Sequence, residues 1–262
     1  MRGTITAIVP TYNRAGFLAE ALEALRSQTR PLDEIIVWDD GSTDATEELM
    51  QGVAAPVRYF RSENGGKSKA LNSALAHATG DYIWICDDDD IALPHAAETL
   101  AQPLDKNPNL GVTGASYRRF RVDPNTGERE EQGPGYWPDL RTGSVARHLL
   151  EDIFLFQNAT LARRRCYDTV GPFREDIARS IDYDMVIRLV THFSIEMIED
   201  TVFLQRKHEG ARGPAAARQA AAQSEDVWKA ADRAVFEPFR ESVPLDVYHA
   251  MYGGGDVDAV GR

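Results

Sequence analysis

Tyr82-Ile83-Trp84-Ile85-Cys86-Asp87-Asp88-Asp89-Asp90 is the stretch that decides the fold, because an apolar run ends there in four consecutive carboxylates. A short run rich in aliphatic and aromatic residues predicts a strand buried inside a sheet. Four adjacent carboxylates repel one another, and in a partly desolvated site some of them would take up protons unless a cation lay nearby. The stretch therefore predicts a buried strand whose carboxyl end binds a cation.

Other segments of the first half show the same alternation of an apolar run, a polar turn and a helical pattern. The predicted strands are residues 4–9, 34–38, 57–60 and 81–85, and the predicted helices between them are residues 17–27, 43–50 and 67–78. Ser42 or Thr43 is expected to cap the second helix. Four such alternations predict an α/β fold with a mostly parallel, Rossmann-like central sheet and helices on both faces.

The pattern changes after Pro94, where strands and helices no longer alternate regularly. A helix is expected as far as Asp105, and residues 121–143, rich in Gly, Pro and charge, are expected to form a loop or an exposed hairpin. Further strands are predicted at residues 111–117, 157–162 and 195–205, with helices at residues 182–191 and from about 219 to 236.

The composition narrows the class of protein. The chain has 262 residues, 43% of them hydrophobic, and a formal net charge of −12. This length suits one α/β core with a smaller appendage, and the acidic balance argues against a nucleic-acid surface. No apolar run approaches the ~20 residues that a membrane span needs, and the N-terminus lacks the pattern of a signal peptide. Cys86 and Cys166 have no metal or redox spacing, so we expect a reduced, cytoplasmic protein.

Polar residues follow each of the four predicted strands, at residues 10–14, 39–44, 64–67 and 87–90. Ligands in open parallel sheets bind at the carboxyl ends of the strands, so these four segments are expected to converge. Carboxylates suit Mg²⁺ or Mn²⁺, which bind a carboxylate or two together with substrate phosphates. Lys67 and Lys69, after two glycines at a helix start, favour a phosphate.

Each of these features also has a plain structural explanation. The acidic run can be a solvated turn, and the Asp39-Asp40 turn can be an ordinary connection whose side chains cap a helix. As a binding site, the same turn offers a carboxylate that accepts the imide N–H of uracil, and Tyr12 offers a ring for the base. The sequence contains neither a Walker-type phosphate loop nor a Gly-x-Gly-x-x-Gly fingerprint, which argues against P-loop and dinucleotide-binding proteins.

Taken together, the motifs at residues 9–14, 37–44, 64–67 and 85–94 resemble the family 2 glycosyltransferases of the GT-A fold. The resemblance covers roughly the first 105 residues. It implies a nucleotide-diphosphate sugar donor, usually linked to UDP, with dTDP an open alternative. Asp40 matches the aspartate that reads uracil. By this resemblance and the chemistry above, the residues expected to bind the donor are Pro10, Tyr12, Arg14, Asp40, Asn64, Lys67, Lys69, Asp87 and Asp88.

The resemblance also implies a metal site and a catalytic base. The family's Asp-x-Asp signature maps onto Asp87 and Asp89, with Asp89 the expected ligand of Mn²⁺ or Mg²⁺ and His208 standing where many members complete the metal site. Asp182 matches the base of inverting members, although Ile181 stands where the family usually has Glu. The alternative is that Asp182 only caps the helix that follows it.

We accordingly divide the chain into a nucleotide-sugar-binding half (residues 1–105), an acceptor-binding and catalytic half of the same GT-A domain (residues 106–218), and a C-terminal helix and tail (residues 219–262). The expected reaction is inverting transfer of a sugar to an acceptor hydroxyl. A sugar-nucleotide nucleotidyltransferase and a non-catalytic nucleotide-sugar-binding module stay open as alternatives. The sequence does not identify the donor sugar or the acceptor; Tyr117, Tyr136 and Trp137 can stack on an acceptor or pack a loop.

Overall fold

The computed structural model describes residues 2–207, 233–241, 243, 245 and 248–249. The strands are β1 (Ile5–Thr11), β2 (Glu34–Asp39), β3 (Val57–Arg61), β4 (Tyr82–Ile85), β5 (Ile91–Ala92), β6 (Val112–Val122), β7 (Arg129–Pro134), β8 (Thr160–Arg163) and β9 (Ile195–Arg206). The helices are α1 (Ala15–Arg26), α2 (Thr46–Met50), α3 (Lys67–His77), α4 (Ala96–Lys106), α5 (Val145–Glu151), α6 (Arg164–Val170) and α7 (Ile181–His192), with a 3₁₀ turn, η1, at Gln157–Ala159.

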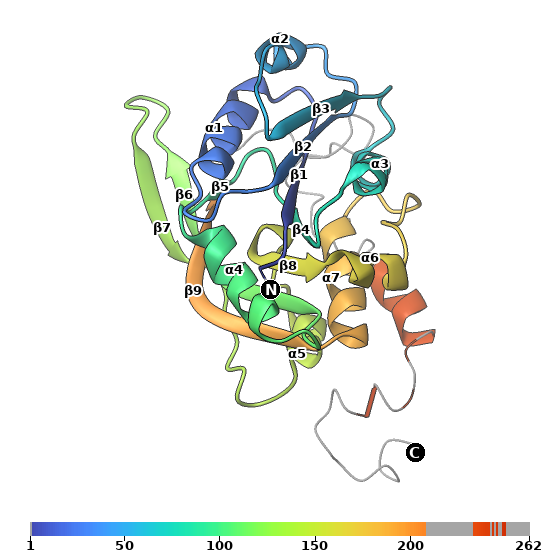
Figure 1. Ribbon diagram of the computed structural model, residues 1–262. Helices are drawn as coiled ribbons and strands as arrows, with labels where there is room; N and C mark the ends of the chain where they lie inside the picture. Colours follow the sequence, from blue (N-terminus) through green and yellow to red (C-terminus); the bar gives the residue numbers. More distant parts are fainter. Residues whose placement is uncertain (1, 208–232, 242, 244, 246–247, 250–262) are drawn as a thin grey trace.

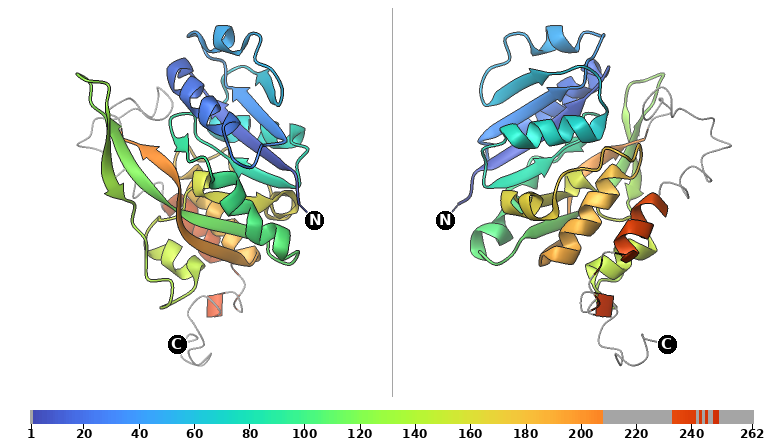
Figure 2. Two further views of the ribbon diagram at one scale, coloured as in Figure 1. Left: turned by 60° about the vertical axis from the view of Figure 1, so that its left-hand side comes forward. Right: turned by 90° about the vertical axis from the view of Figure 1, so that its right-hand side faces the viewer.

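One sheet joins all of these strands in the order β3-β2-β1-β4-β8-β6-β9-β5, and β7 pairs with β6 outside this path. Helices cover both faces: α1 and α4 lie on one side, and α3, α6 and α7 lie on the other (Figures 1 and 2). The predicted α/β architecture with helices on both faces is therefore confirmed.

The first half is parallel, as the sequence predicts. β3, β2, β1 and β4 run parallel to one another. Every residue of β1, β2 and β4 is buried, because strands covered by helices on both sides need apolar side chains on both faces. Trp84 is fully buried at the centre of this core. All four carboxyl ends therefore lie along one edge, where their polar segments meet.

The second half is mixed, so the prediction of a mostly parallel sheet holds only for the first half. β8 runs antiparallel to both β4 and β6, and β5 runs antiparallel to β9. β6 and β7 form the hairpin anticipated for residues 121–143, and a tight hairpin joins only antiparallel strands. β9 then returns parallel to β6 with irregular register.

Some local predictions need correction. The second helix is only the short α2, and its N-cap residue is Ala45 rather than Ser42 or Thr43. The Ser42 hydroxyl instead accepts a hydrogen bond from the backbone N–H of Asn13, 2.9 Å away, because the turn after β1 packs against the turn after β2. Helices α5 and α6 were not predicted from the sequence, since each is only seven residues long.

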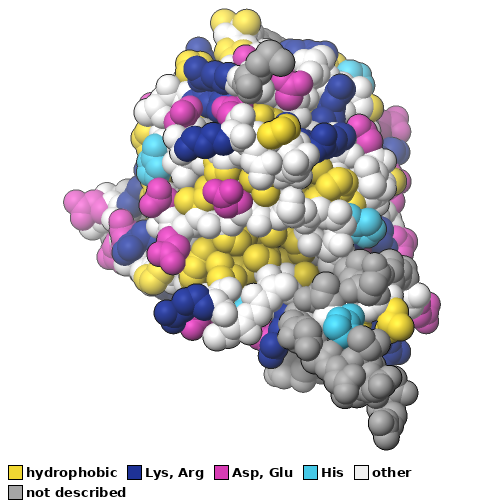
Figure 3. All heavy atoms as spheres, turned by 60° about the horizontal axis from the view of Figure 1, so that its bottom comes forward, with side chains coloured by type: hydrophobic (Ala, Val, Ile, Leu, Met, Phe, Trp, Pro, Cys, Tyr) yellow, Lys and Arg dark blue, Asp and Glu magenta, His cyan; other side chains and the backbone are white. Residues whose placement is uncertain are grey.

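Part of the predicted C-terminal region lies outside the described residues. Residues 233–241 are helical, while residues 219–232 and the tail from 250 onward are not described. Within the described chain, no helix has the length and apolarity needed to cross a membrane. On the side of the molecule where β9 and α5 lie, hydrophobic side chains gather in a hollow (Figure 3).

Two glycine substitutions test the packing of the first half. A Cβ atom at Gly80 would lie 2.6 Å from the backbone nitrogen of Thr6 in β1, whereas one at Gly16, in α1, would meet nothing within 4 Å. Gly80→Ala should lower the free energy of unfolding by about 1–3 kcal/mol through overpacking. Gly16→Ala should leave it unchanged or raise it by up to about 1 kcal/mol, because alanine favours a helix. Urea denaturation measures the free energy of unfolding of both variants, and equal changes would contradict the close packing of Gly80 against β1.

Candidate active site

The carboxyl ends of β1 and β4 are tied together by side chains. The Thr11 hydroxyl donates to Oδ2 of Asp88 over 2.7 Å. Nη1 of Arg14 donates to Oδ1 of Asp88 over 3.0 Å and to Oδ2 of Asp89 over 2.8 Å. The predicted donor-binding residue Arg14 thus lies directly on the acidic run, and a guanidinium here partly balances two of its carboxylates.

The turns after β2 and β3 are joined by Asp40. Its two carboxylate oxygens accept the backbone N–H groups of Gly65 and Gly66, over 2.7 and 2.8 Å. Gly41 has φ of +80°, and a Cβ there would lie 2.8 Å from the backbone nitrogen of Asn64. Asp40 is only 6% exposed. It therefore braces this edge, and each of its oxygens keeps one further lone pair for a ligand.

Lys67 connects the acidic run to the start of α7. Its ammonium lies 2.5 Å from Oδ1 of Asp87. Burial opposes this charge, but the carboxylates of Asp87 and Asp182 together raise the pKa of Lys67. A lysine held charged at the first residue of α3 is suited to an anionic ligand, since the helix N-terminus attracts negative charge as well.

Asp182, the predicted base, lies within electrostatic reach of this pair. It is half-buried and is the second residue of α7, whereas the N-cap is Ser180, so Asp182 is not the capping residue. Burial raises the pKa of the Asp182 carboxyl, the Lys67 ammonium opposes the rise, and the charge of Asp87 adds to it. A carboxyl group in such surroundings is better able to accept a proton than an ordinary surface aspartate.

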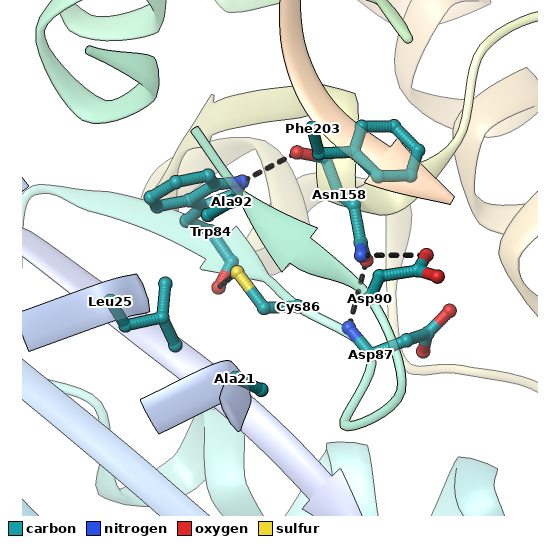
Figure 4. Close-up of a pocket in the computed structure, with 9 residues that line it drawn as sticks. All are labelled: Ala21, Leu25, Trp84, Cys86, Asp87, Asp90, Ala92, Asn158 and Phe203. Carbon is teal, nitrogen blue, oxygen red and sulfur yellow. Dashed lines mark hydrogen bonds between the residues drawn. The ribbon is translucent and has the colours of Figure 1, made fainter. Parts of the chain in front are cut away.

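Two residues of the second half hold the acidic run in place, and neither is predicted from the sequence. Asn158 accepts the backbone N–H of Asp87 over 2.8 Å and donates to Oδ2 of Asp90 over 3.0 Å. The backbone carbonyl of Asn158 accepts a hydrogen bond from the indole N–H of Trp84, as Figure 4 shows. The backbone N–H of Arg206 donates to Oδ1 of Asp90, and Nε of Arg206 donates to the carbonyl of Asp89.

All four carboxylates of the run therefore have partners within the chain. Burial raises the pKa of Asp88 to about 6, against the lowering effect of the Arg14 charge. Burial and then the charges of Asp89 and Asp87 raise the pKa of Asp90 well above its ordinary value. Arg14 and Lys67, predicted only as donor-binding residues, therefore also place positive charge beside the run, for which the sequence predicted a divalent cation.

The acidic run also fits a divalent cation. One carboxylate oxygen from each of Asp87, Asp89 and Asp90 lies within 4.8 Å of the other two. Asp90 already accepts hydrogen bonds on both oxygens, so Asp87 and Asp89 are the better candidates for ligands. A small void of about 10 Å³ beside Asp87 and Asp90 has room for one water at most, so it is no substrate site (Figure 4). His208, the other predicted ligand, lies outside the described residues.

The remaining predicted donor-binding residues differ in accessibility. The ring of Tyr12 is on the surface, with 41% of the residue exposed, while Pro10 is buried within β1. Asn64 and Lys69 are exposed. Asn64 donates through its side chain to the carbonyl of Asp40, and a Cβ at Gly65 would meet Cδ of Lys69, so the lysine stem passes over that glycine.

Solved structures with the same fold define the class of protein. The mannosyltransferase PcManGT from Pyrobaculum calidifontis, in complex with GDP-Man and Mn²⁺, matches 96% of this chain and 70% of its own with a TM-score of 0.66 and 21% identity. S. aureus TarS 1-349, in complex with UDP-GlcNAc, matches 84% of this chain and 63% of its own with a TM-score of 0.66 and 19% identity. The fold is thus the GT-A fold of glycosyltransferases.

The sequence match is to one family within that class. The model for "Glycosyl transferase family 2" matches residues 6–170, so the chain belongs to this family. An uncharacterized glycosyltransferase of Rickettsia typhi is 26% identical over 78% of this chain, and the chondroitin synthase of Pasteurella multocida is 29% identical over 71%. The chain spans 64% of the length of the first relative and 18% of the second.

Asn158 offers a test of how the acidic run is held. Asn158→Leu leaves the N–H of Asp87 unpaired and removes one donor from Asp90, so the free energy of unfolding should fall by about 1–3 kcal/mol. The adjacent Gln157 is also buried, and its side-chain amide has no hydrogen-bond partner in the described part of the chain. Gln157→Leu should therefore be neutral or stabilising. Chemical denaturation measures the free energy of unfolding of both variants. If both lose the same amount, the hydrogen bonds of Asn158 do not stabilise the acidic run.

Proposed function

We propose that this protein transfers a sugar from a nucleotide-diphosphate sugar, with UDP or dTDP as the nucleotide, to an acceptor hydroxyl, with a divalent metal and with inversion at the anomeric carbon. The observation that carries the proposal is the convergence of Arg14, Lys67 and Asp182 on the acidic run. This edge of the sheet thereby offers cations that could bind a diphosphate and carboxylates that could bind a metal ion. It also offers a half-buried carboxyl group that could accept a proton.

The donor is proposed to lie across the carboxyl ends of the first strands. Exposed Tyr12 offers a ring to the base, and Asp40 offers its remaining lone pairs to the imide N–H of uracil or thymine. Arg14 and Lys67 lie where they can attract the diphosphate. UDP-GlcNAc bound to TarS and GDP-Man bound to PcManGT support a nucleotide sugar as ligand.

The chemistry proposed is a single displacement. Asp182 takes the proton from the acceptor hydroxyl as its oxygen attacks the anomeric carbon, and one displacement inverts the configuration there. Lys67 beside Asp182 favours the charged carboxylate before the proton arrives. A Mn²⁺ or Mg²⁺ ion held by Asp87 and Asp89 would offset negative charge on the leaving diphosphate.

Family membership argues against a sugar-nucleotide nucleotidyltransferase. A non-catalytic nucleotide-sugar-binding module would retain Tyr12 and Asp40 but would have no need of Asp182. The rise in the pKa of Asp182, produced by burial and by Asp87 against Lys67, favours an enzyme over such a module.

Removal of one metal ligand tests the metal assignment. Asp89→Ala should abolish transfer and make UDP binding insensitive to Mn²⁺ and Mg²⁺, because the diphosphate loses its bridging cation. Calorimetric titration with UDP, with and without Mn²⁺, measures the second effect. Asp168→Asn, an exposed aspartate on α6, is the matched control and should behave as the native protein. Full activity of the native protein in excess EDTA would refute the metal requirement.

Replacement of the proposed base tests the mechanism. Asp182→Asn keeps the size of the side chain but cannot accept a proton, so single-turnover transfer at saturating donor should fall by about 10²–10⁴-fold. UDP affinity should barely change. Because the pKa of Asp182 is raised, the native rate should fall as the pH drops through a value above that of an ordinary aspartate, and the variant should lose this dependence. A variant rate within about threefold of native, well below the usual worth of a general base, would eliminate Asp182.

A further inference from the structure

A second pocket, separate from the acidic run, lies between β6, β9 and the segment that follows β7. Its volume is about 350 Å³, within the range of small-molecule sites. Aromatic residues Tyr117, Tyr136 and Trp137 line it together with the polar residues Ser116, Glu199 and Thr201. None of its lining residues is assigned a role in donor binding or proton transfer.

The aromatic part of this pocket combines a packed ring with an exposed one. Trp137 is half-buried, and its ring packs edge-on against Phe154 with centroids 5.7 Å apart and an interplanar angle of 88°. Tyr136 is 45% exposed and is one of the few large hydrophobic side chains on the surface. A packed indole beside an exposed phenol presents flat aromatic faces to a ligand, and aromatic side chains have few rotatable bonds to order on binding.

The polar part of the pocket indicates a hydroxylated, uncharged ligand. The hydroxyls of Ser116 and Thr201 lie 3.3 Å apart, and Glu199 is exposed beside them. Among the described residues that line the pocket there is no Lys or Arg, and the nearby Arg119 is engaged by the phenol of Tyr117. A phosphate or carboxylate ligand needs such cations, whereas a sugar ring places its C–H face on an aromatic ring and its hydroxyls against Ser, Thr and Glu.

An aromatic wall connects this pocket to the proposed active site. The ring of Tyr117, which is buried beneath the pocket, stacks on Phe203 with centroids 5.3 Å apart. Phe203 lines the small void beside Asp87 and Asp90. The phenol oxygen of Tyr117 accepts a hydrogen bond from Arg119, so it is already engaged within the chain. The pocket is therefore linked to the acidic run through two packed rings, Tyr117 and Phe203.

We infer that this pocket binds a neutral sugar unit of the acceptor, so that the acceptor is a saccharide held at a position other than its reacting hydroxyl. The inference rests on the proposed glycosyltransferase function. Tyr136 and Trp137 stack on the sugar ring, and Glu199 with Thr201 accepts and donates hydrogen bonds to its hydroxyls. The pocket would then set acceptor preference without contacting the donor.

The experiment uses the full chain without donor. Methyl glycosides and trisaccharides of glucose, galactose, mannose and N-acetylglucosamine are titrated, with binding followed by saturation-transfer NMR and tryptophan fluorescence. At least one trisaccharide should bind, and Tyr136→Ala should weaken it by about tenfold or more through loss of an aromatic anchor. Tyr136→Phe, which keeps the ring, should bind as the native protein. Glu199→Gln should weaken binding, while the exposed neighbour Asp200→Asn should not.

Three results would overturn the inference: none of the saccharides binds, Tyr136→Ala binds as well as the native protein, or glucose 6-phosphate binds more tightly than glucose because of its phosphate. UDP affinity, measured on every variant, separates this inference from the proposed function. Loss of saccharide binding with unchanged UDP affinity locates the effect in the pocket. Saccharide binding by a native protein that binds neither UDP nor dTDP would instead retain the pocket and refute the proposed donor site.

Discussion

The structure depends on placing four consecutive carboxylates at the end of a fully buried strand. Charges in such a position are costly unless other groups pair with them. Thr11 and Arg14 from the first strand end, Lys67 from α3, and Asn158 and Arg206 from the second half supply these partners. The acidic run is thus the point at which the two halves of the sheet are joined, as well as the candidate site.

This dual role explains why the polar groups divide into two sets. Asn158 and the backbone of Arg206 are buried and bind Asp90, which leaves that carboxylate with little capacity for a ligand. Arg14 and Lys67 are more accessible and pair with Asp87, Asp88 and Asp89. The first set holds the backbone of the turn. In the proposed function, Arg14 and Lys67 would bind the diphosphate instead of the carboxylates, and the carboxylates that they release would bind the metal ion. Asp40 combines the two roles, because it braces two turns and keeps one lone pair on each oxygen for a ligand.

The division of labour between the halves follows from the sheet. The parallel half presents strand ends and helix N-termini, which suit a nucleotide and its phosphates. The mixed half contributes the start of α7 with Asp182 and the curved pair β6 and β9, against which the aromatic pocket is built. Under the proposed function, donor and acceptor would thus bind to different halves of one sheet, on either side of the acidic run.

The sequence alone determined the parallel order of the first half, because strands β1 to β4 and the polar turns after them each have a recognisable local pattern, although the bounds of α2 differed from the prediction. Thus Arg14, Asp40, Lys67 and the acidic run could be predicted to meet. Tertiary structure alone decided the antiparallel half and the supports of the site. Asn158 lies 71 residues from Asp87, and Arg206 lies 117 from Asp89. No short-range periodicity specifies such pairings. They form only when β9 and the η1 turn before β8 reach the sheet and place their polar groups beside the backbone and carboxylate groups of the acidic run.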